Sequence, residues 1–245
     1  MPLLHTEAIT LRRRRGKDAD ALVILYGKTS GKVTASTKSV MKTQSRYAGV
    51  TQPLNRIHAV LYAKNTEQEI WTLTQVALIQ SYDTIQKDLT RLSYASCLME
   101  WVDFLSHEFQ SSYRVWTTMV QAFERWNEQA PCLEDLYYFQ WRLLCAAGFQ
   151  PEIFHCLHTK ATEAPGWVYI PKEGGLVANT LGLDGYPLTA GTIQALRKLA
   201  ASPTPPAVRL SPSQSKEIKA LYKIHLEYHV GLRSRAELFL ERYQS

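Results

Sequence analysis

The sequence predicts an α+β protein, in which a five-stranded N-terminal barrel of the OB kind is followed by an α-helical bundle. Short β-branched or alternating segments, separated by turn residues, fill about the first eighty residues. From Asp83 onward the apolar period changes to about 3.6 residues, and the two parts also differ in charge. We expect a barrel domain at 1–80 and a helical domain at 81–245, with an irregular insert at about 149–188.

The predicted barrel consists of five short strands. Gly27 and Gly31 bracket the turn after the second strand. Five short strands with no helical period are typical of an OB fold. An SH3-like barrel fits almost as well, because the sequence does not determine the strand order. The expected strands are 7–12, 21–26, 32–38, 55–63 and 69–78.

The N-terminal quarter carries charge of almost one sign. Residues 1–66 contain twelve Lys or Arg and three Asp or Glu, whereas the remaining chain contains sixteen and nineteen, and 21–66 has no acidic residue. Because alternate side chains of a strand share a face, Lys32 and Lys38 should point away from the core together. A basic groove of this kind favours a polyanion, in particular single-stranded nucleic acid. The alternative is a solvated strand edge that only opposes aggregation.

The candidate phosphate contacts lie along the third strand, in the loop after it, and at the end of the first strand. The arginine run at 11–18 has an alternative role as a basic tag or flexible arm. Trp71 alternates with Leu73, so we expect it in the core rather than as a stacking platform. The candidate contacts are Lys32, Lys38, Lys42, Arg46, Arg12 and Arg14.

The helical domain is predicted from amphipathic segments with recognisable ends. Asp88 is suited to cap the first helix, and Gly148 with Pro151 should end the third. The segment 149–188 is rich in Gly and Pro and has no sustained period. The expected helices are 88–108, 111–128, 133–148, 189–202 and 211–230.

A metal site in the insert is possible but not favoured. His155, Cys156 and His158 resemble half of a zinc knuckle, but a structural zinc ion needs four ligands, and 159–188 supplies no further Cys or His. Two histidines of a later helix, His225 and His229, would have to complete it. We therefore expect no metal and no cofactor. The four cysteines are scattered, which favours free thiols and a cytoplasmic protein, and no apolar run is long enough to cross a bilayer.

The sequence argues against an enzyme. It contains no G-x-S-x-G, P-loop or H-E-x-x-H pattern. A metal-dependent nuclease needs clustered carboxylates to hold its ions, and the basic segment has none. The charge distribution alone is equally compatible with a DNA-binding protein and with an RNA-binding or ribosome-associated barrel protein.

Several segments, in order, resemble the bacterial recombination mediator family RecO over nearly the whole chain. They include "GKVTASTKSV", "SRYAGVTQPL", "LTQVALIQSYDTI", "WRLLCAAGFQP" and "LEYHVGLRSR". The resemblance implies an OB fold followed by a helical bundle with an inserted zinc-ribbon-like element. It also implies a non-catalytic cytoplasmic protein, associated with the nucleoid, that binds single- and double-stranded DNA and anneals complementary strands. With the partner RecR it would help RecA load onto DNA coated by single-stranded DNA-binding protein (SSB).

The resemblance also bears on the insert and on a second partner surface. Many members carry two CxxC pairs in the insert, whereas this chain keeps only Cys156, which implies a degenerate element filled by side chains such as Trp167, Tyr169 and Ile170. The family's surface for the acidic, Phe-terminated SSB tail needs an apolar pocket beside a cation. Tyr138 and Arg142, four residues apart on a predicted helix, are the candidates. The alternative is that this helix face belongs to the core.

Overall fold

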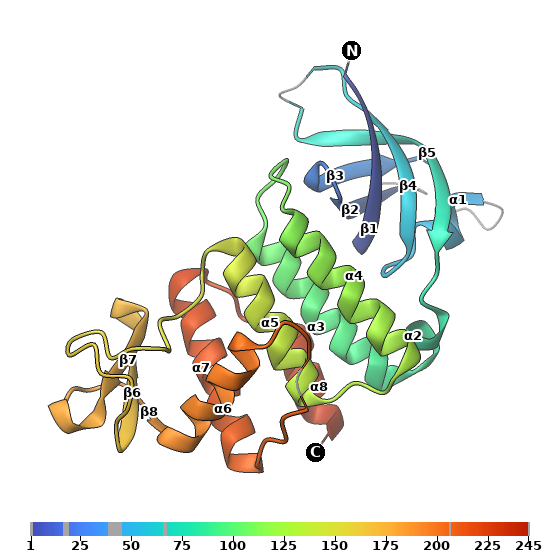
Figure 1. Cartoon of the computed structure of the whole chain (residues 1–245). Coiled ribbons are helices and arrows are strands. Elements are labelled where there is room, and N and C mark those ends of the chain that lie inside the picture. Colours follow the sequence, from blue (N-terminus) through green and yellow to red (C-terminus); the bar gives the residue numbers. More distant parts are fainter. Residues whose placement is uncertain (1, 17–19, 39–45, 66–67, 206, 245) are drawn as a thin grey trace.

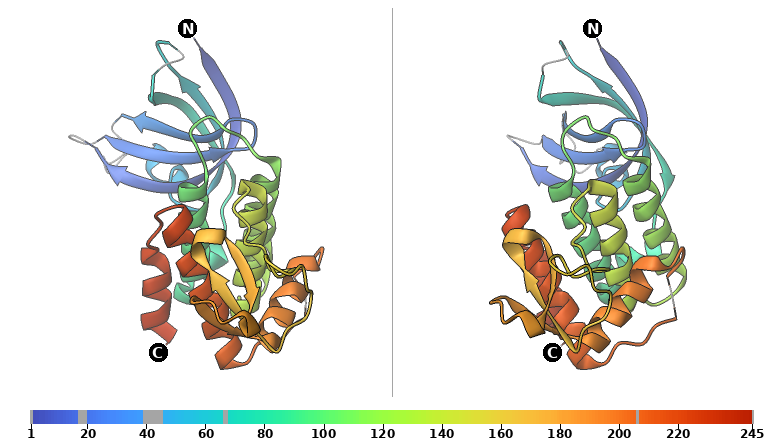
Figure 2. Two further views of the ribbon diagram at one scale, coloured as in Figure 1. Left: turned by 90° about the vertical axis from the view of Figure 1, so that its left-hand side faces the viewer. Right: turned by 60° about the vertical axis from the view of Figure 1, so that its left-hand side comes forward.

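The computed structural model describes residues 2–16, 20–38, 46–65, 68–205 and 207–244. The chain forms a barrel at one end, a group of helices in the middle, and a small three-stranded sheet at the far end (Figures 1 and 2). The N-terminus lies on the barrel, and the C-terminus lies beside the helices (Figure 1).

The barrel is closed by pairing of its first and fourth strands. The strand order is β1-β2-β3-β5-β4, and β1 pairs antiparallel with β4. β3 and β5 run parallel and pair at only three positions. This Greek-key arrangement is that of an OB fold, which confirms the prediction. The strands are β1 Leu3–Arg15, β2 Ala21–Gly27, β3 Gly31–Thr37, β4 Arg56–Tyr62 and β5 Ile70–Gln80, and the short helix α1 Arg46–Val50 precedes β4.

Burial along β3 alternates as the sequence predicts. Val33 and Ala35 are buried in the barrel, while Lys32 and its alternate neighbours are only partly buried. Trp71 on β5 is 7% exposed and packs in the same apolar cluster, which confirms its place in the core.

The helices begin and end largely where their capping residues predict. The Asp88 side chain accepts a hydrogen bond from the Arg91 N–H at the start of α3. Gly148 ends α5 in the left-handed conformation. The sequence did not predict the last helix, α8. The helices are α2 Asp83–Lys87, α3 Leu89–Leu105, α4 Tyr113–Glu128, α5 Leu133–Ala147, α6 Ala190–Ala201, α7 Pro212–His229 and α8 Arg235–Gln244.

The outer face of the barrel is joined to the helices by apolar packing. A bulge between Thr10 and Arg12 shifts the register of β1 against β2. Ile9, Ile24 and Tyr26 belong to the same apolar cluster as the helical core. The barrel therefore docks by its outer face, and this covers part of the surface on which the basic residues lie.

The loop 106–112 between α3 and α4 presses on the start of β3. The Phe109 N–H donates a 2.9 Å hydrogen bond to the Lys32 carbonyl oxygen, and the Phe109 ring packs 5.5 Å from the ring of Trp71. Gly31 permits this approach. Its φ is +70°, and a Cβ atom there would lie 2.1 Å from the Gln110 carbonyl oxygen.

The insert contains regular structure that the sequence did not predict. Its strands are β6 Gly166–Ile170, β7 Gly175–Ala178 and β8 Tyr186–Thr189, in the order β7-β6-β8. Strands of four or five residues, separated by turns of one 3₁₀ helix each, are too short to establish a period of two. Trp167 and Tyr169 are buried and Ile170 packs on the same core, as implied for the fillers.

His225 of α7 ties the insert to the helical core. Its Nε2–H donates to the Phe149 carbonyl oxygen, and its Nδ1 accepts a hydrogen bond from the Tyr169 hydroxyl. Burial is the main cause that lowers the pKa of His225 to about 4; the bond to Phe149 opposes the shift and nearby His229 adds to it. The imidazole is therefore neutral in the folded protein and serves as a structural bridge.

The Gly31→Ala substitution tests the contact between β3 and the loop. We expect it to lower the free energy of unfolding by more than the roughly 1–3 kcal/mol that a left-handed non-glycine residue costs, because its Cβ atom also meets the loop backbone. Gly182→Ala is the matched control, since Gly182 has a φ of +65° and its Cβ would meet nothing within 4 Å. Urea unfolding compares the two variants, and equal losses would contradict the close contact.

Acidification tests the role of His225. The unfolded chain takes up a proton on this side chain near pH 6.5, whereas the folded protein does so only near pH 4. We expect the free energy of unfolding to fall by about 3 kcal/mol between these values, at about 1.4 kcal/mol per pKa unit. His225→Gln should reduce this pH dependence, and His107→Gln, in the exposed loop, should not. The same pH profile for both variants would refute the assignment.

Candidate nucleic-acid interface

The outer face of β1, β2 and β3 brings the basic residues into rows. Arg14 pairs with Leu22, which pairs with Ser36, and the next row consists of Arg12, Ile24 and Thr34. Neighbouring strands lie about 4.8 Å apart, so Arg14 and Ser36 are about 10 Å apart across the sheet. Arg12, Arg14 and Lys32 therefore share the face that the alternation predicts.

The end of this face near the helices is occupied by an acid of α3. Arg12 Nη2 lies 2.9 Å from one carboxylate oxygen of Asp103, and Lys32 Nζ lies 3.5 Å from the other. Lys32 Nζ also donates a 2.7 Å hydrogen bond to the Asp103 carbonyl oxygen. The Lys32 side chain is only 16% exposed and that of Arg12 is 42% exposed. The structure thus differs from the sequence-based picture, in which both residues project freely into a groove.

The far end of the face remains open. Arg14 is exposed on it, and Lys38 is exposed directly after the end of β3. Arg15 is exposed at the same end of the barrel, but it alternates to the other side of β1. None of the three has an ion pair with the residues that the structure describes. Lys42 lies outside the described residues. The backbone of Arg46 begins α1, but its side chain also lies outside them.

Arg13, between Arg12 and Arg14, points to the other side of the strand. Its Nη1 donates hydrogen bonds to the Ala48 carbonyl oxygen, at 2.6 Å, and to the Thr51 hydroxyl, at 3.3 Å. It therefore anchors α1 and the turn after it to the end of the barrel. The alternation of β1 could have indicated this separate role.

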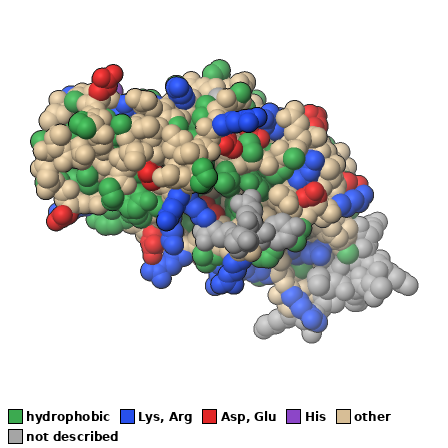
Figure 3. All heavy atoms as spheres, turned by 90° about the horizontal axis from the view of Figure 1, so that it is seen from below, with side chains coloured by type: hydrophobic (Ala, Val, Ile, Leu, Met, Phe, Trp, Pro, Cys, Tyr) green, Lys and Arg blue, Asp and Glu red, His purple; other side chains and the backbone are tan. Residues whose placement is uncertain are grey.

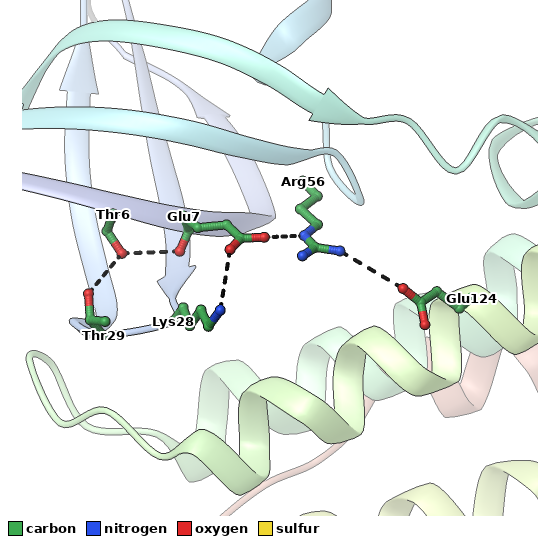
Figure 4. Close-up of polar contacts among 6 residues, drawn as sticks. All are labelled: Thr6, Glu7, Lys28, Thr29, Arg56 and Glu124. Atoms are coloured by element: carbon green, nitrogen blue, oxygen red, sulfur yellow. Dashed lines mark hydrogen bonds and ion pairs between the residues drawn. The ribbon is translucent and has the colours of Figure 1, made fainter.

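A second set of ion pairs connects the barrel with α4 (Figure 4). Arg56 of β4 pairs with Glu7 of β1, and its Nη1 lies 3.9 Å from a carboxylate oxygen of Glu124. Its guanidinium group lies 5.7 Å from the ring centroid of Trp116. Lys28 pairs with the same Glu7 at 3.7 Å. Two further cations of the acid-free segment, Lys28 and Arg56, are therefore paired with acids, whereas Lys38 and Lys64 are exposed.

The face of the molecule seen in Figure 3 carries its Lys and Arg side chains unevenly. In Figure 3, Lys and Arg side chains gather mainly in the middle and right-hand parts of the face, and the left-hand part carries few. The left-hand part corresponds to the end of the molecule that carries the three-stranded sheet (Figures 1 and 3). The insert is therefore a poor polyanion surface on this face.

The two residues predicted for a peptide tail lie together, but one of them is buried. The Arg142 guanidinium lies 5.9 Å from the ring centroid of Tyr138. Tyr138 is 1% exposed, and its hydroxyl donates a 2.9 Å hydrogen bond to the Pro203 carbonyl oxygen. Its ring is therefore core, as the alternative interpretation of this helix held, and it offers no open pocket.

A different face of α5 lines an open cleft of about 640 Å³. Its walls come from α3, α5, α7 and α8, and they are mostly apolar. The charged residues in the lining are two lysines on α7 and two glutamates, Glu134 on α5 and Glu237 on α8. Lys216 is exposed at this cleft. Sequence reasoning missed it because its walls come from helices far apart in the chain. Residues that define the cleft are Leu133, Leu136, Tyr137, Lys216, Lys219 and Leu240.

The insert does not present a set of zinc ligands. Cys156 is buried, and its Sγ accepts a 3.4 Å hydrogen bond from the Ala178 N–H. Burial disfavours the thiolate, but hydrogen bonds from Thr159, Ala178 and His158 lower the pKa of the thiol to about 7. His158 instead pairs with Glu173 at 2.8 Å. Among the described residues no group of three or more His, Cys, Asp or Glu could hold a metal, so the ligands here do not fit zinc.

All four cysteines are free thiols. None of the helices in the described ranges is both long and apolar enough to span a bilayer.

Comparison with known proteins gives a consistent assignment. Two protein-family models match the sequence. The family model "Recombination protein O N terminal" matches residues 1–82, and the family model "Recombination protein O C terminal" matches residues 86–237. DNA repair protein RecO of Symbiobacterium thermophilum is 27% identical over 254 positions, covering 100% of this chain and 99% of that protein. RecO of Heliobacterium modesticaldum is 34% identical over 189 positions, covering 73% and 66%, and that of Bacillus velezensis is 25% identical, covering 99% and 96%. The OB barrel, its exposed basic end and these matches agree, and the chain belongs to the RecO family of DNA repair proteins.

Proposed function

We propose that this protein binds DNA through the exposed end of the outer barrel face and brings complementary strands together. The observation that carries the proposal is three exposed cations at this end of the barrel, which have no acidic partner among the described residues. They are Arg14 and Lys38, with Arg15 on the other side of β1. Lys42 and Arg46 follow in the sequence next to Lys38 and extend the proposed contact set. Phosphate contacts of this kind supply affinity that does not depend on base sequence.

Annealing requires a surface that holds the backbone and leaves the bases free to pair. The barrel rings Tyr26 and Trp71 are not available for stacking, since Tyr26 is 1% exposed and Trp71 is 7% exposed. A face of exposed cations beside buried rings favours contact with phosphates rather than with bases. A surface that binds phosphates without reading bases can bind both single- and double-stranded DNA. This suits a protein that must hold the single strands before annealing and the duplex after it.

The cellular role proposed is that of a recombination mediator. In this role the protein, with RecR, promotes RecA loading onto single-stranded DNA coated by SSB, in the cytoplasm at the nucleoid. It is proposed to act without catalysis, because strand pairing consumes no co-substrate. An RNA-binding or ribosome-associated role remains the alternative, and an annealing assay on SSB-coated DNA separates the two.

The SSB tail is proposed to bind at the apolar cleft rather than at Tyr138. An acidic peptide that ends in an aromatic residue needs an apolar pocket beside a cation. The cleft supplies apolar walls from α5 and α8, and Lys216 at its edge supplies the exposed charge. Arg142 stays a second candidate, because it is partly exposed beside the buried Tyr138 ring.

Removal of the three exposed cations tests DNA binding directly. We expect Arg14→Ala, Arg15→Ala and Lys38→Ala together to reduce the slope of log K against log salt for oligo(dT) by about 2, at roughly 0.7 per phosphate contact. The matched control removes the same charge from exposed lysines elsewhere, with Lys172→Ala, Lys198→Ala and Lys223→Ala. An unchanged slope in the first variant, or an equal loss in the control, would remove the barrel face from the proposal.

Charge reversal at the cleft tests the tail site. We expect Lys216→Glu to weaken binding of an acidic, Phe-terminated peptide by about tenfold, which corresponds to about 1.4 kcal/mol, because the peptide then meets a like charge. Arg142→Glu is the comparison variant and should change the affinity much less. Fluorescence anisotropy of a labelled peptide measures both. The reverse ranking would place the tail at Arg142.

A further inference from the structure

Acidic and aromatic groups of the helical domain lie on the part of the barrel face that continues the proposed DNA-binding surface. The Asp103 side chain is 10% exposed, and its two oxygens face Arg12 and Lys32. Arg12 shares β1 with Arg14, and Lys32 lies on β3, which ends directly before Lys38. Asp103 therefore neutralises the charges that would otherwise lengthen the exposed basic end.

The loop that follows α3 adds one more carboxylate, from Glu108, and one aromatic ring, from Phe109. A carboxylate oxygen of Glu108 lies 3.1 Å from the Thr34 hydroxyl, which donates to it. Lys32 and Glu108 also form an isolated parallel β-bridge. The Phe109 ring packs against Trp71. Carboxylates thus lie beside cations and a strand hydroxyl, where the phosphates of a nucleotide chain would otherwise contact the same groups.

We propose that Asp103, Glu108 and Phe109 form an acidic clasp, which occupies part of the polyanion-binding face and competes with nucleic acid for Arg12 and Lys32. This inference rests on the proposed function, because it concerns regulation of the same site. With the clasp closed, DNA contacts only the exposed end of the face. With the clasp displaced, two further cations become available, and the site extends along β1 and β3.

Part of the clasp is open to solvent while the two domains stay packed. Arg12 is 42% exposed, and Glu108 and Phe109 are exposed as well, so phosphates reach these groups from solvent. The apolar contact through Ile9, Ile24 and Tyr26 does not involve the clasp residues and remains buried. Competition for a partly exposed ion pair is screened by salt, so the clasp should matter most at low ionic strength.

The test compares salt dependence of oligo(dT) binding in wild type and Asp103→Asn. We expect the slope of log K against log salt to become steeper by about 0.7–1.4, which is one or two released cations at roughly 0.7 each, with tighter binding at low salt. Glu124→Gln is the matched control. It removes an acid that also joins the helices to a barrel arginine, but Arg56 keeps its pair with Glu7, so the slope should not change.

A double-mutant cycle identifies the released cation. Arg12→Ala should change the wild-type slope little, because Asp103 already holds Arg12, but in the Asp103→Asn background it should remove about 0.7. The clasp is refuted if Asp103→Asn keeps both the wild-type slope and the wild-type urea midpoint, or if Arg12→Ala alone already costs about 0.7.

A second variant decides the case if Asp103→Asn does not fold. Glu108→Gln with Phe109→Ala changes only exposed side chains and should tighten oligo(dT) binding at low salt; unchanged affinity overturns the clasp. If the proposed DNA-binding function itself is wrong, the binding measurements give a different result. In that case wild type itself shows no salt-dependent DNA binding, whereas failure of the clasp alone leaves wild-type binding intact.

Discussion

Asp103, near the end of α3, places one nearly buried carboxylate between two cations of the barrel, Arg12 on β1 and Lys32 on β3. A carboxylate removed from water costs several kcal/mol unless it is paired, so this junction needs both cations. The apolar face of Ile9, Ile24 and Tyr26 packs beside it. Together they determine how the barrel sits on the helices. They also decide which basic residues stay exposed, and therefore where a polyanion can bind.

Local signals in the sequence predicted most of the secondary structure. The alternation along β3 and the Asp88 and Gly148 caps are interactions between near neighbours, so the residues themselves reveal them. The sheet of the insert was missed because four- and five-residue strands show no clear period. The last helix, α8, was also missed. Its N-terminus is capped in part by Glu100, whose carboxylate accepts hydrogen bonds from Ser234 and from the Arg235 and Ala236 N–H groups. That partner lies more than a hundred residues away.

The difference between local interactions and contacts between distant residues also explains which candidate site residues were predicted correctly. The alternation predicted that Lys32 points out of the barrel, as it does. It could not show that Asp103, about seventy residues after Lys32, neutralises that residue and Arg12. Similarly, helical spacing brought Tyr138 and Arg142 together, yet the contact of Tyr138 with Pro203 places its hydroxyl in the core. Charge counts predict where polyanions are favoured; tertiary partners decide which of those charges are free.

Hydrogen exchange of the full chain with and without oligo(dT) tests the central claim most directly, since it reports contact along the whole backbone. We expect protection concentrated at the exposed end of the barrel face, around 13–16 and 36–38, with the insert unaffected. Protection confined to the helices or to the three-stranded sheet, with these barrel segments unchanged, would contradict it.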